Sequence, residues 1–277
     1  MKIGILMLRH APTRTSPIMT DVVRLLREWT AEVDVIYPEE QCTRLAGLKP
    51  AHDLYVLKSA SDLALSYAGA LHAAGAVVLN PYPSVALLRD RIAATRRLVE
   101  AGVPVPESYV TSEAKTLAPL LDEGPLVLKP SRTSRRGVHV VWDADELDDV
   151  SSGDGPIFAQ RWLRPDGQER KIYCIGGQLF GVVRTWPART FDEKVGEAFA
   201  LGPELREIAL ACGRAFGVDV FALDVLVSEG RPYVVNVQSF PGFKGVPDAA
   251  LRLADYVYAA AQRAAAARAS EAEARTA

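Results

Sequence analysis

The chain has few cysteines and no long apolar segment. Only three of its 277 residues are cysteine, and Cys42, Cys174 and Cys212 lie far apart without a C-x-x-C spacing. This pattern argues against a disulfide framework or a zinc site and is typical of a protein of the reducing cytosol. No apolar run approaches the roughly 18 residues of a membrane-spanning helix, and residues 1–8 are too short for a secretion signal. We therefore expect a cytoplasmic protein with no membrane partner.

The chain also lacks an excess of charge and two common nucleotide-binding motifs. Its formal net charge is −2, so we expect no nucleic-acid partner. There is no G-x-x-x-x-G-K-[ST] and no G-x-G-x-x-G, which argues against a P-loop and against a dinucleotide-binding turn. A hydrophobic content of 49% is nevertheless sufficient for a sizeable core, divided over two or three sub-domains.

Short apolar segments alternate with helix-like segments in the N-terminal third. Strands are expected at residues 2–8, 33–37, 53–58 and 76–80, and helices at residues 19–30 and 61–75, the second capped by Ser61 or Asp62. This alternation predicts a parallel, doubly wound sheet, that is, a small Rossmann-like domain. A helix over residues 84–101 and an extended linker at residues 102–106 are expected to follow.

Two apolar runs nearer the C-terminus predict a β-hairpin with a polar patch. Residues 221–227 and 233–237 flank a turn-forming segment, and a loop centred on Gly230 pairs Val227 with Tyr233 and Asp224 with Asn236. Because side chains alternate along a strand, Gln238 shares a face with Asn236 and extends the patch. On their own, these residues favour an ordinary polar strand surface.

The second strand continues as Asn236-Val237-Gln238-Ser239-Phe240-Pro241-Gly242, which resembles the magnesium-site segment of ATP-grasp enzymes. That family has an Asp on the first strand and acid-x-Asn-x-x-Pro-Gly on the second; here Asn236 replaces the acid and Gln238 replaces the Asn. The segment is most similar to RimK-type ligases and inositol-phosphate kinases. The resemblance implies ATP and Mg²⁺ as cofactors, with Asp224, Asn236 and Gln238 at the metal.

Two cationic positions upstream resemble the phosphate contacts of the same family. Arg91 follows Asp90 where the family has a phosphate-contacting lysine, and Lys129 ends the expected strand at residues 126–130. A lysine at this place is implied to bind a phosphate as a point charge. The loop at residues 131–138 would cover the phosphates; it contains one glycine and three arginines, which a basic surface loop explains equally well.

Residues 157–184 resemble the adenine hinge and the hairpin that follows it. The resemblance implies adenine contacts from the hinge residues Gln160, Arg161, Trp162 and Leu163, chiefly through backbone groups near Arg161 and Leu163. It places Glu169 at the ribose hydroxyls and Lys171 at a basic position of the nucleotide site. Arg184 matches the arginine that meets the transferred phosphate, so Arg184 and Lys129 are the expected catalytic residues. The next stretch, 185–200, would shape the acceptor pocket, but Trp186-Pro187-Ala188-Arg189-Thr190 departs from the family pattern.

The resemblance spans roughly residues 1–265 and implies an ATP-grasp fold of mixed α/β and α+β class. We expect a Rossmann-like domain at 1–88, a lid at 89–160, a core at 161–265 and a frayed or disordered tail at 266–277. Helices are expected at 203–216, ending at Gly217, and at 247–265.

Three functions remain open. The first is an ATP-dependent carboxylate–amine ligase, for amino acids or peptides, that forms an acyl phosphate from an acid and transfers it to an amine. The second is a small-molecule kinase of the inositol-phosphate type. The third is an ATP-binding pseudoenzyme, because Asn236 offers magnesium only a neutral carbonyl. An oligomer is possible in each case.

Overall fold

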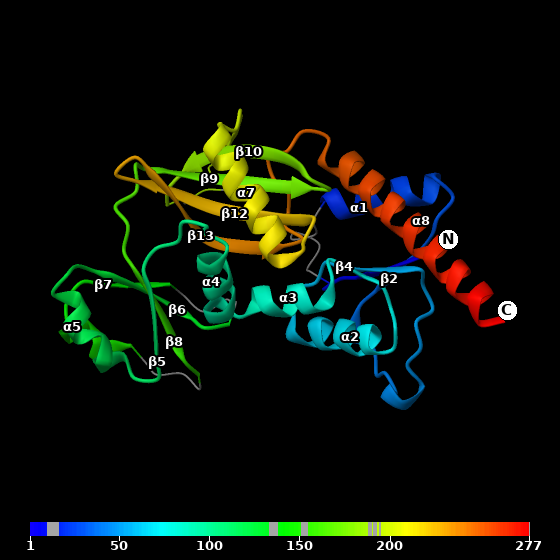
Figure 1. Ribbon diagram of the computed structural model, residues 1–277, viewed down its shortest axis with the longest axis horizontal. Helices are drawn as coiled ribbons and strands as arrows, with labels where there is room; N and C mark the ends of the chain where they lie inside the picture. The colour runs from blue at the N-terminus through cyan, green and yellow to red at the C-terminus, as the bar shows by residue number, and fades with distance from the viewer. Residues whose placement is uncertain are drawn as a thin grey trace.

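The computed structural model describes residues 1–9, 17–132, 138–150, 155–187, 190, 193 and 195–276. Within these ranges the strands form three sheets, one from each successive part of the chain. Figure 1 shows the lid sheet at the lower left, the core sheet above it, and the N-terminal sheet on the right. The arrangement has the three parts expected of an ATP-grasp fold, although the domain boundaries at residues 88 and 160 stay predictions.

The N-terminal sheet is parallel throughout, in the order β2-β1-β3-β4, as the alternation predicted. Ser61 caps the second helix by accepting a hydrogen bond from the Ala64 N–H. The elements are β1 (Lys2–Leu6), α1 (Pro17–Glu28), β2 (Glu32–Ile36), η2 (Pro38–Glu40), η3 (Leu45–Gly47), β3 (Leu54–Leu57), α2 (Asp62–Ala73) and β4 (Val78–Leu79).

Two helices, α3 (Tyr82–Arg89) and α4 (Arg91–Glu100), replace the single helix expected over residues 84–101. The break falls at Asp90, whose backbone is extended at φ −100° and ψ 106°. Its carboxylate accepts hydrogen bonds from the N–H groups of Ile92 and Ala93 and so caps α4. Asp90 also forms an isolated bridge with Arg132, which ties this break to the end of the lid strand carrying Lys129.

The lid sheet has the antiparallel order β5-β8-β6-β7. Its outer face packs apolar side chains such as Leu126 and Leu128 against the short helices of the lid. The lid strand at residues 108–111 was not predicted from the sequence, because its apolar pattern is weak. The elements are β5 (Ser108–Thr111), η4 (Ala114–Leu117), α5 (Ala118–Leu121), β6 (Leu126–Pro130), β7 (His139–Val141), η5 (Asp145–Asp149) and β8 (Ile157–Arg161).

The core sheet has the order β11-β10-β9-β12-β13. Helix α7 ends at Gly217 as predicted, with this glycine at φ 62°. One face of the sheet packs on α4 and α7, and part of the other packs on α8. The elements are β9 (Gln168–Ile175), β10 (Gln178–Thr185), β11 (Glu197–Phe199), α7 (Pro203–Phe216), β12 (Val220–Ser228), β13 (Arg231–Ser239) and α8 (Ala249–Thr276).

The hairpin of β12 and β13 has a tighter turn than expected. Glu229 and Gly230 both adopt positive φ, 51° and 76°, and Ser228 pairs with Arg231. This is the two-residue turn that suits the twist of a hairpin, so Val227 faces Pro232 and the predicted pairing of Val227 with Tyr233 is wrong. A bulge at Val235 then adds one residue to β13, and Asp224 still faces Asn236, as predicted.

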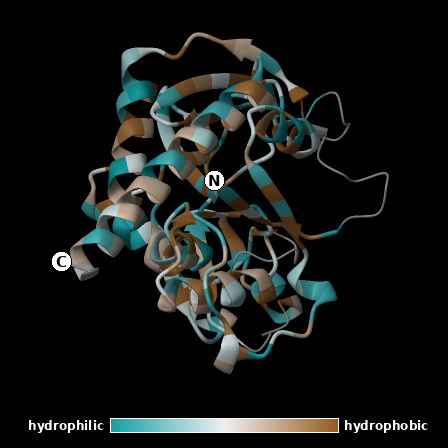
Figure 2. Cartoon of the chain, turned by 90° about the vertical axis from the view of Figure 1, so that its right-hand side faces the viewer, coloured by the Kyte–Doolittle hydropathy of each residue, from teal (hydrophilic) through white to brown (hydrophobic). Residues whose placement is uncertain are grey.

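Helix α8 joins the two larger parts of the molecule. It packs beside α1, and its buried side chains share one apolar cluster with the N-terminal sheet and the core sheet (Figure 1). Figure 2 shows hydrophobic residues on the central strands and a mixture of both kinds along this helix. The helix continues to Thr276, where a frayed or disordered tail was expected from residue 266. Arg268 fixes its last turns by donating to the Asp53 carboxylate at 3.1 Å and to the His52 carbonyl at 2.6 Å.

A second link between these parts is Asn80, which is fully buried directly after β4. Its amide group donates to the Val220 carbonyl at 2.7 Å, and its oxygen accepts from the Val220 N–H at 3.1 Å. The first residue of β12 is thereby fixed to the end of the N-terminal sheet.

Candidate functional site

A row of charged side chains crosses the core sheet on the same face as its α8-packed residues. Lys171 on β9 lies directly opposite Asp224 on β12, which lies directly opposite Asn236 on β13. The Lys171 ammonium and the Asp224 carboxylate form a short buried ion pair. The Asn236 amide donates to the other Asp224 oxygen at 2.8 Å. The structure thus brings together the residues predicted at the metal and a lysine predicted at the nucleotide.

The next row holds Glu169 and Arg184, which are directly paired on β9 and β10 and form a second short ion pair. The Arg184 guanidinium also lies 3.5 Å from Asp224. Burial, followed by the neighbouring Asp224 charge, raises the pKa of Glu169 against the effect of Arg184. Burial would also raise the pKa of Asp224, but Lys171, Asn236 and Arg184 hold it below its ordinary value. Two cations and two carboxylates therefore form one closed, electrically balanced cluster.

Lys129 approaches this cluster from the lid. Its ammonium donates to the Gln160 side-chain oxygen at 2.6 Å and to the Val235 carbonyl at 3.3 Å, so it connects the lid to the bulge of the hairpin. Burial, with a smaller contribution from the charge of Arg91, lowers its pKa to about 8. An anion bound beside this ammonium would favour its charged form and raise this pKa again.

Arg91 lies beside Lys129 but contacts the backbone. Its guanidinium donates to the Pro130 carbonyl at 2.5 Å and to the Arg132 carbonyl at 3.0 Å. Burial lowers its pKa. In this structure Arg91 holds the end of β6 in place, and its predicted phosphate contact stays a prediction.

The hinge residues divide between the two faces of the lid sheet. Gln160 lies on the inner face and is buried between Lys129 and Ser108. The Arg161 guanidinium points to the outer face, where it donates to the carbonyls of Leu120 and Gly124 at 2.9 and 2.7 Å. The structure therefore keeps the Arg161 side chain on the opposite face of the lid from Lys129.

The backbone N–H groups at the end of the hinge are also engaged within the lid. The N–H of Arg161 donates to the Glu107 carbonyl at 2.8 Å, and that of Trp162 donates to the Pro125 carbonyl at 2.9 Å. Adenine recognition by this segment, including Leu163, stays a prediction and would use other backbone groups.

An exposed apolar strip on the lid was not among the predicted site residues. By register, Val140 shares a face with Val127 and Gln160, the inner face that carries Lys129. Val140 is 39% exposed, and Val138 and Trp142, which continue the same alternation, are each 57% exposed. The centroid of the Trp142 ring lies 5.4 Å from that of the Trp162 ring. The period-two pattern of residues 138–142 was the available signal for this surface.

Two predicted regions lie partly outside the described residues. The loop at residues 131–138 is described only at its ends, so two of its three arginines, Arg135 and Arg136, receive no structural account. In the stretch at 185–200, Ala188 and Arg189 likewise lie outside them.

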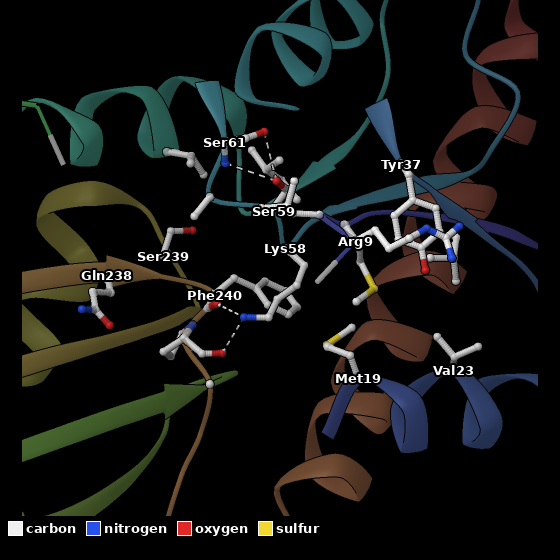
Figure 3. A pocket seen from close by; sticks show the side chains of 18 of the residues that line it. Arg9, Met19, Val23, Tyr37, Lys58, Ser59, Ser61, Gln238, Ser239 and Phe240 are labelled. Carbon is white, nitrogen blue, oxygen red and sulfur yellow. Dashed lines mark hydrogen bonds between the residues drawn. The ribbon is translucent and has the colours of Figure 1, made fainter. Parts of the chain in front are cut away.

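A cavity of about 1860 Å³ lies where the carboxyl ends of the parallel strands meet the hairpin. Sequence reasoning missed it, because its walls come from segments far apart in the chain. Figure 3 shows Lys58 from the N-terminal sheet and Gln238 and Ser239 from the hairpin around it. Lys58 donates to the carbonyls of Phe240 and Pro241 at 2.8 and 3.1 Å, and burial lowers its pKa to about 8. The carboxyl ends of parallel strands are the usual place for a ligand in such sheets.

The family model of the RimK-like ATP-grasp domain matches residues 88–257, which is more than half of the chain. The chain belongs to the RimK-like ATP-grasp family. The matched region contains the lid, the charged rows and the hairpin, and thus all the predicted site residues. It excludes the whole N-terminal sheet, which supplies one wall of the cavity.

Curated relatives of this RimK-like chain include ligases. It is 27% identical over 192 residues to a probable alpha-L-glutamate ligase of Parasynechococcus marenigrum, covering 64% of the chain and 41% of the relative. It is 23% identical over 243 residues to the glutamate–LysW ligase ArgX of Sulfolobus acidocaldarius, covering 81% of this chain and 86% of the relative. The chain thus spans less than half of the length of the first of these two relatives.

Solved structures share the fold of this RimK-like chain. A RimK domain ATP-grasp protein from Sphaerobacter thermophilus superposes with a TM-score of 0.78 at 21% identity, covering 92% of this chain and 99% of that one. A D-alanine–D-alanine ligase from Bacillus anthracis, complexed with ATP, gives a TM-score of 0.67 at 21% identity, covering 94% of this chain and 92% of that one. These similarities confirm the ATP-grasp fold. No helix among the described residues is long and apolar enough to cross a membrane.

Proposed function

We propose that the chain is an ATP-dependent carboxylate–amine ligase that acts through an acyl phosphate. The observation that carries the proposal is that Lys129 reaches from the lid to the hairpin that carries Asp224, the partner of the Lys171 and Arg184 cations, in a RimK-like ATP-grasp chain. Relatives named as glutamate ligases support ligase over kinase chemistry. Amino acids or peptides are therefore the proposed substrate class.

The proposed ATP site lies between the inner face of the lid and the charged rows of the core sheet. Lys129 is placed to bind a phosphate group, because its ammonium already lies between the two parts. The exposed strip of Val138, Val140 and Trp142 supplies apolar surface for the base. Glu169 is the proposed ribose contact, which requires its carboxylate to share or leave its ion pair with Arg184.

The proposed reaction has two steps. An oxygen of the acid attacks the γ-phosphorus of ATP, the bond to the bridging oxygen breaks, and ADP leaves with that electron pair. The amine nitrogen then attacks the acyl carbon, and inorganic phosphate leaves as the amine loses a proton. Negative charge moves between oxygen atoms in both steps, and the Lys129 and Arg184 cations stabilise it where it develops.

The acid and the amine are proposed to bind in the cavity beside the hairpin. This cavity reaches Gln238 and so adjoins the charged rows, while Lys58 adds a cation to its wall. The apolar side chains Met19 and Val23 line another part of it (Figure 3). A substrate with a carboxylate and an apolar portion fits this lining.

The test measures the two phosphate-containing products separately. Candidate acids and amines are added in pairs with ATP and magnesium, and ADP and inorganic phosphate are both quantified. We expect equal amounts of the two, and product formation only when both an acid and an amine are present. A stable phosphorylated product without phosphate release would assign the chain to the kinases instead. The variant Lys58→Met is expected to raise the KM for the acid while leaving the KM for ATP unchanged.

A further inference from the structure

Both oxygens of the Asp224 carboxylate are already occupied by donors of the chain. One accepts from the Lys171 ammonium, with the Arg184 guanidinium 3.5 Å away, and the other accepts from the Asn236 amide at 2.8 Å. Asp224 and Lys171 are each less than 8% exposed, so solvent does not weaken this pairing appreciably. Asp224 is thus fully satisfied by the protein itself.

The remaining donors on the hairpin do not suit a divalent metal ion. Magnesium prefers charged oxygen ligands in an octahedral arrangement at about 2.0–2.1 Å. Asn236 directs its amino group, not its oxygen, toward Asp224, since a carboxylate can only accept. The Gln238 oxygen faces Lys171 at 3.4 Å. Among the described residues, no group of three or more His, Cys, Asp or Glu side chains is placed to hold a metal ion.

The charge of the cluster also argues against a divalent cation bound at the hairpin. The Lys171 and Arg184 cations balance the Asp224 and Glu169 carboxylates without any added ion. A divalent cation at Asp224 would lie beside an ammonium and a guanidinium group, which repel it. It would also have to displace Lys171 from a buried ion pair, which costs much more than separating an exposed one.

We infer that the Lys171 ammonium takes the place of a hairpin-bound divalent cation, so that the chain itself supplies the positive charge at Asp224, Asn236 and Gln238. Any magnesium in the reaction then enters with ATP and is not bound by the hairpin beforehand. This inference rests on the proposed nucleotide site, and it assigns Lys171 as a positioning residue. It is an alternative to the prediction that Asp224, Asn236 and Gln238 are metal ligands.

The test uses Mn²⁺ alone as the probe, with the full chain and without nucleotide. Paramagnetic broadening of backbone amide resonances shows where Mn²⁺ binds. We expect no broadening of the amides of β12 and β13 in the wild type at submillimolar Mn²⁺. Saturable broadening of these amides at submillimolar Mn²⁺ would overturn the inference, and broadening confined to other acidic surfaces would agree with it.

Two double variants sharpen the test. Lys171→Met with Asn236→Asp removes the internal cation and restores a second carboxylate, and is expected to bind Mn²⁺ at the hairpin at least about tenfold more tightly than the wild type. Lys171→Arg with Asn236→Asp is the matched control, which keeps the positive charge and is expected to bind more weakly than the first. Equal affinities in the two would contradict a role for the Lys171 charge. If either variant does not fold, the wild-type broadening decides the question.

The outcome of the Mn²⁺ measurement does not depend on whether the chain is catalytically active. If no substrate pair releases ADP, the proposed function fails, while the Mn²⁺ measurement on the hairpin still stands. If ADP is released but the wild-type hairpin binds Mn²⁺, the inference fails and the proposed function remains.

Discussion

Lys129 of the lid donates a hydrogen bond of 3.3 Å to the carbonyl of Val235, the residue that the bulge adds to β13. The bulge interrupts the regular pairing of β13 with β12, and a lysine from another sheet contacts the backbone at that point. The same bulge keeps Asp224 opposite Asn236. One irregularity in the hairpin therefore sets both the contact between lid and core and the composition of the charged row.

Removing the Lys129 ammonium should weaken ATP binding. Lys129→Ala deletes the cationic side chain that connects the lid strand to the hairpin bulge. We expect the Kd for ATP, measured by calorimetry, to rise at least about tenfold while the fold is retained. Lys115→Ala is the control, because Lys115 pairs with Asp148 at 2.8 Å and is exposed. Equal ATP affinity in Lys129→Ala and the wild type would refute the phosphate role.

ATP binding should take up a proton at mildly alkaline pH. The pKa of Lys129 is about 8 in the free protein, so above this pH most of these lysines are neutral. A bound phosphate favours the charged ammonium and raises this pKa, so protons are taken up between about pH 8 and the ordinary lysine value of about 10. ATP affinity should accordingly fall as the pH rises through this range.

Calorimetry in buffers of different ionisation enthalpy measures this uptake. Lys129→Met should abolish it, whereas Lys58→Met should not, although the pKa of Lys58 is also about 8. Proton uptake that persists in Lys129→Met would show that another group is responsible.

The exposed strip on the lid should contribute to base binding and not to phosphate binding. Trp142 is 57% exposed and lies 5.4 Å from Trp162, so its ring is accessible to an adenine. We expect Trp142→Ala to raise the Kd for ATP by about threefold to tenfold, which is the effect expected from the loss of one aromatic contact. Binding of inorganic tripolyphosphate should be unchanged. If calorimetry shows an equal loss of affinity for ATP and for tripolyphosphate, the substitution distorts the lid.

Restoring a carboxylate at residue 236 should destabilise the metal-free protein. Asn236→Asp replaces a donor to Asp224 with a like charge directly opposite it, so we expect the free energy of unfolding in chelator to fall by about 1–3 kcal/mol. Magnesium with ATP should recover more stability in this variant than in the wild type, because a ligand of the folded state stabilises it. Thermal melting with and without magnesium-ATP measures both effects.

Asn236→Leu is the matched control for that experiment. It also removes the donated hydrogen bond but adds no charge, so it should lose stability without gaining a larger magnesium response. Equal magnesium shifts in Asn236→Asp and Asn236→Leu would show that residue 236 does not influence metal binding.

Much of the local structure followed from the sequence alone. The alternation of apolar segments predicted the parallel N-terminal sheet, and Gly217 correctly marked a helix end. The pairing of Asp224 with Asn236 was also predicted, but it holds because the bulge at Val235 offsets a turn that is one residue tighter than expected. The short motifs, in their order, were sufficient to indicate the ATP-grasp fold.

Only the tertiary structure decided which partners these residues have. The sequence does not show that Arg91 binds the backbone at the end of β6, nor that Arg161 faces away from Lys129, because both outcomes depend on contacts across the lid. It places Lys171 and Arg184 near a nucleotide but does not show that they neutralise Asp224 and Glu169. The cavity at Lys58 likewise arises where segments almost 200 residues apart meet. The physical reason is that a charge pairs with whatever the packed sheets bring within a few ångströms, and strand patterns carry no information about that.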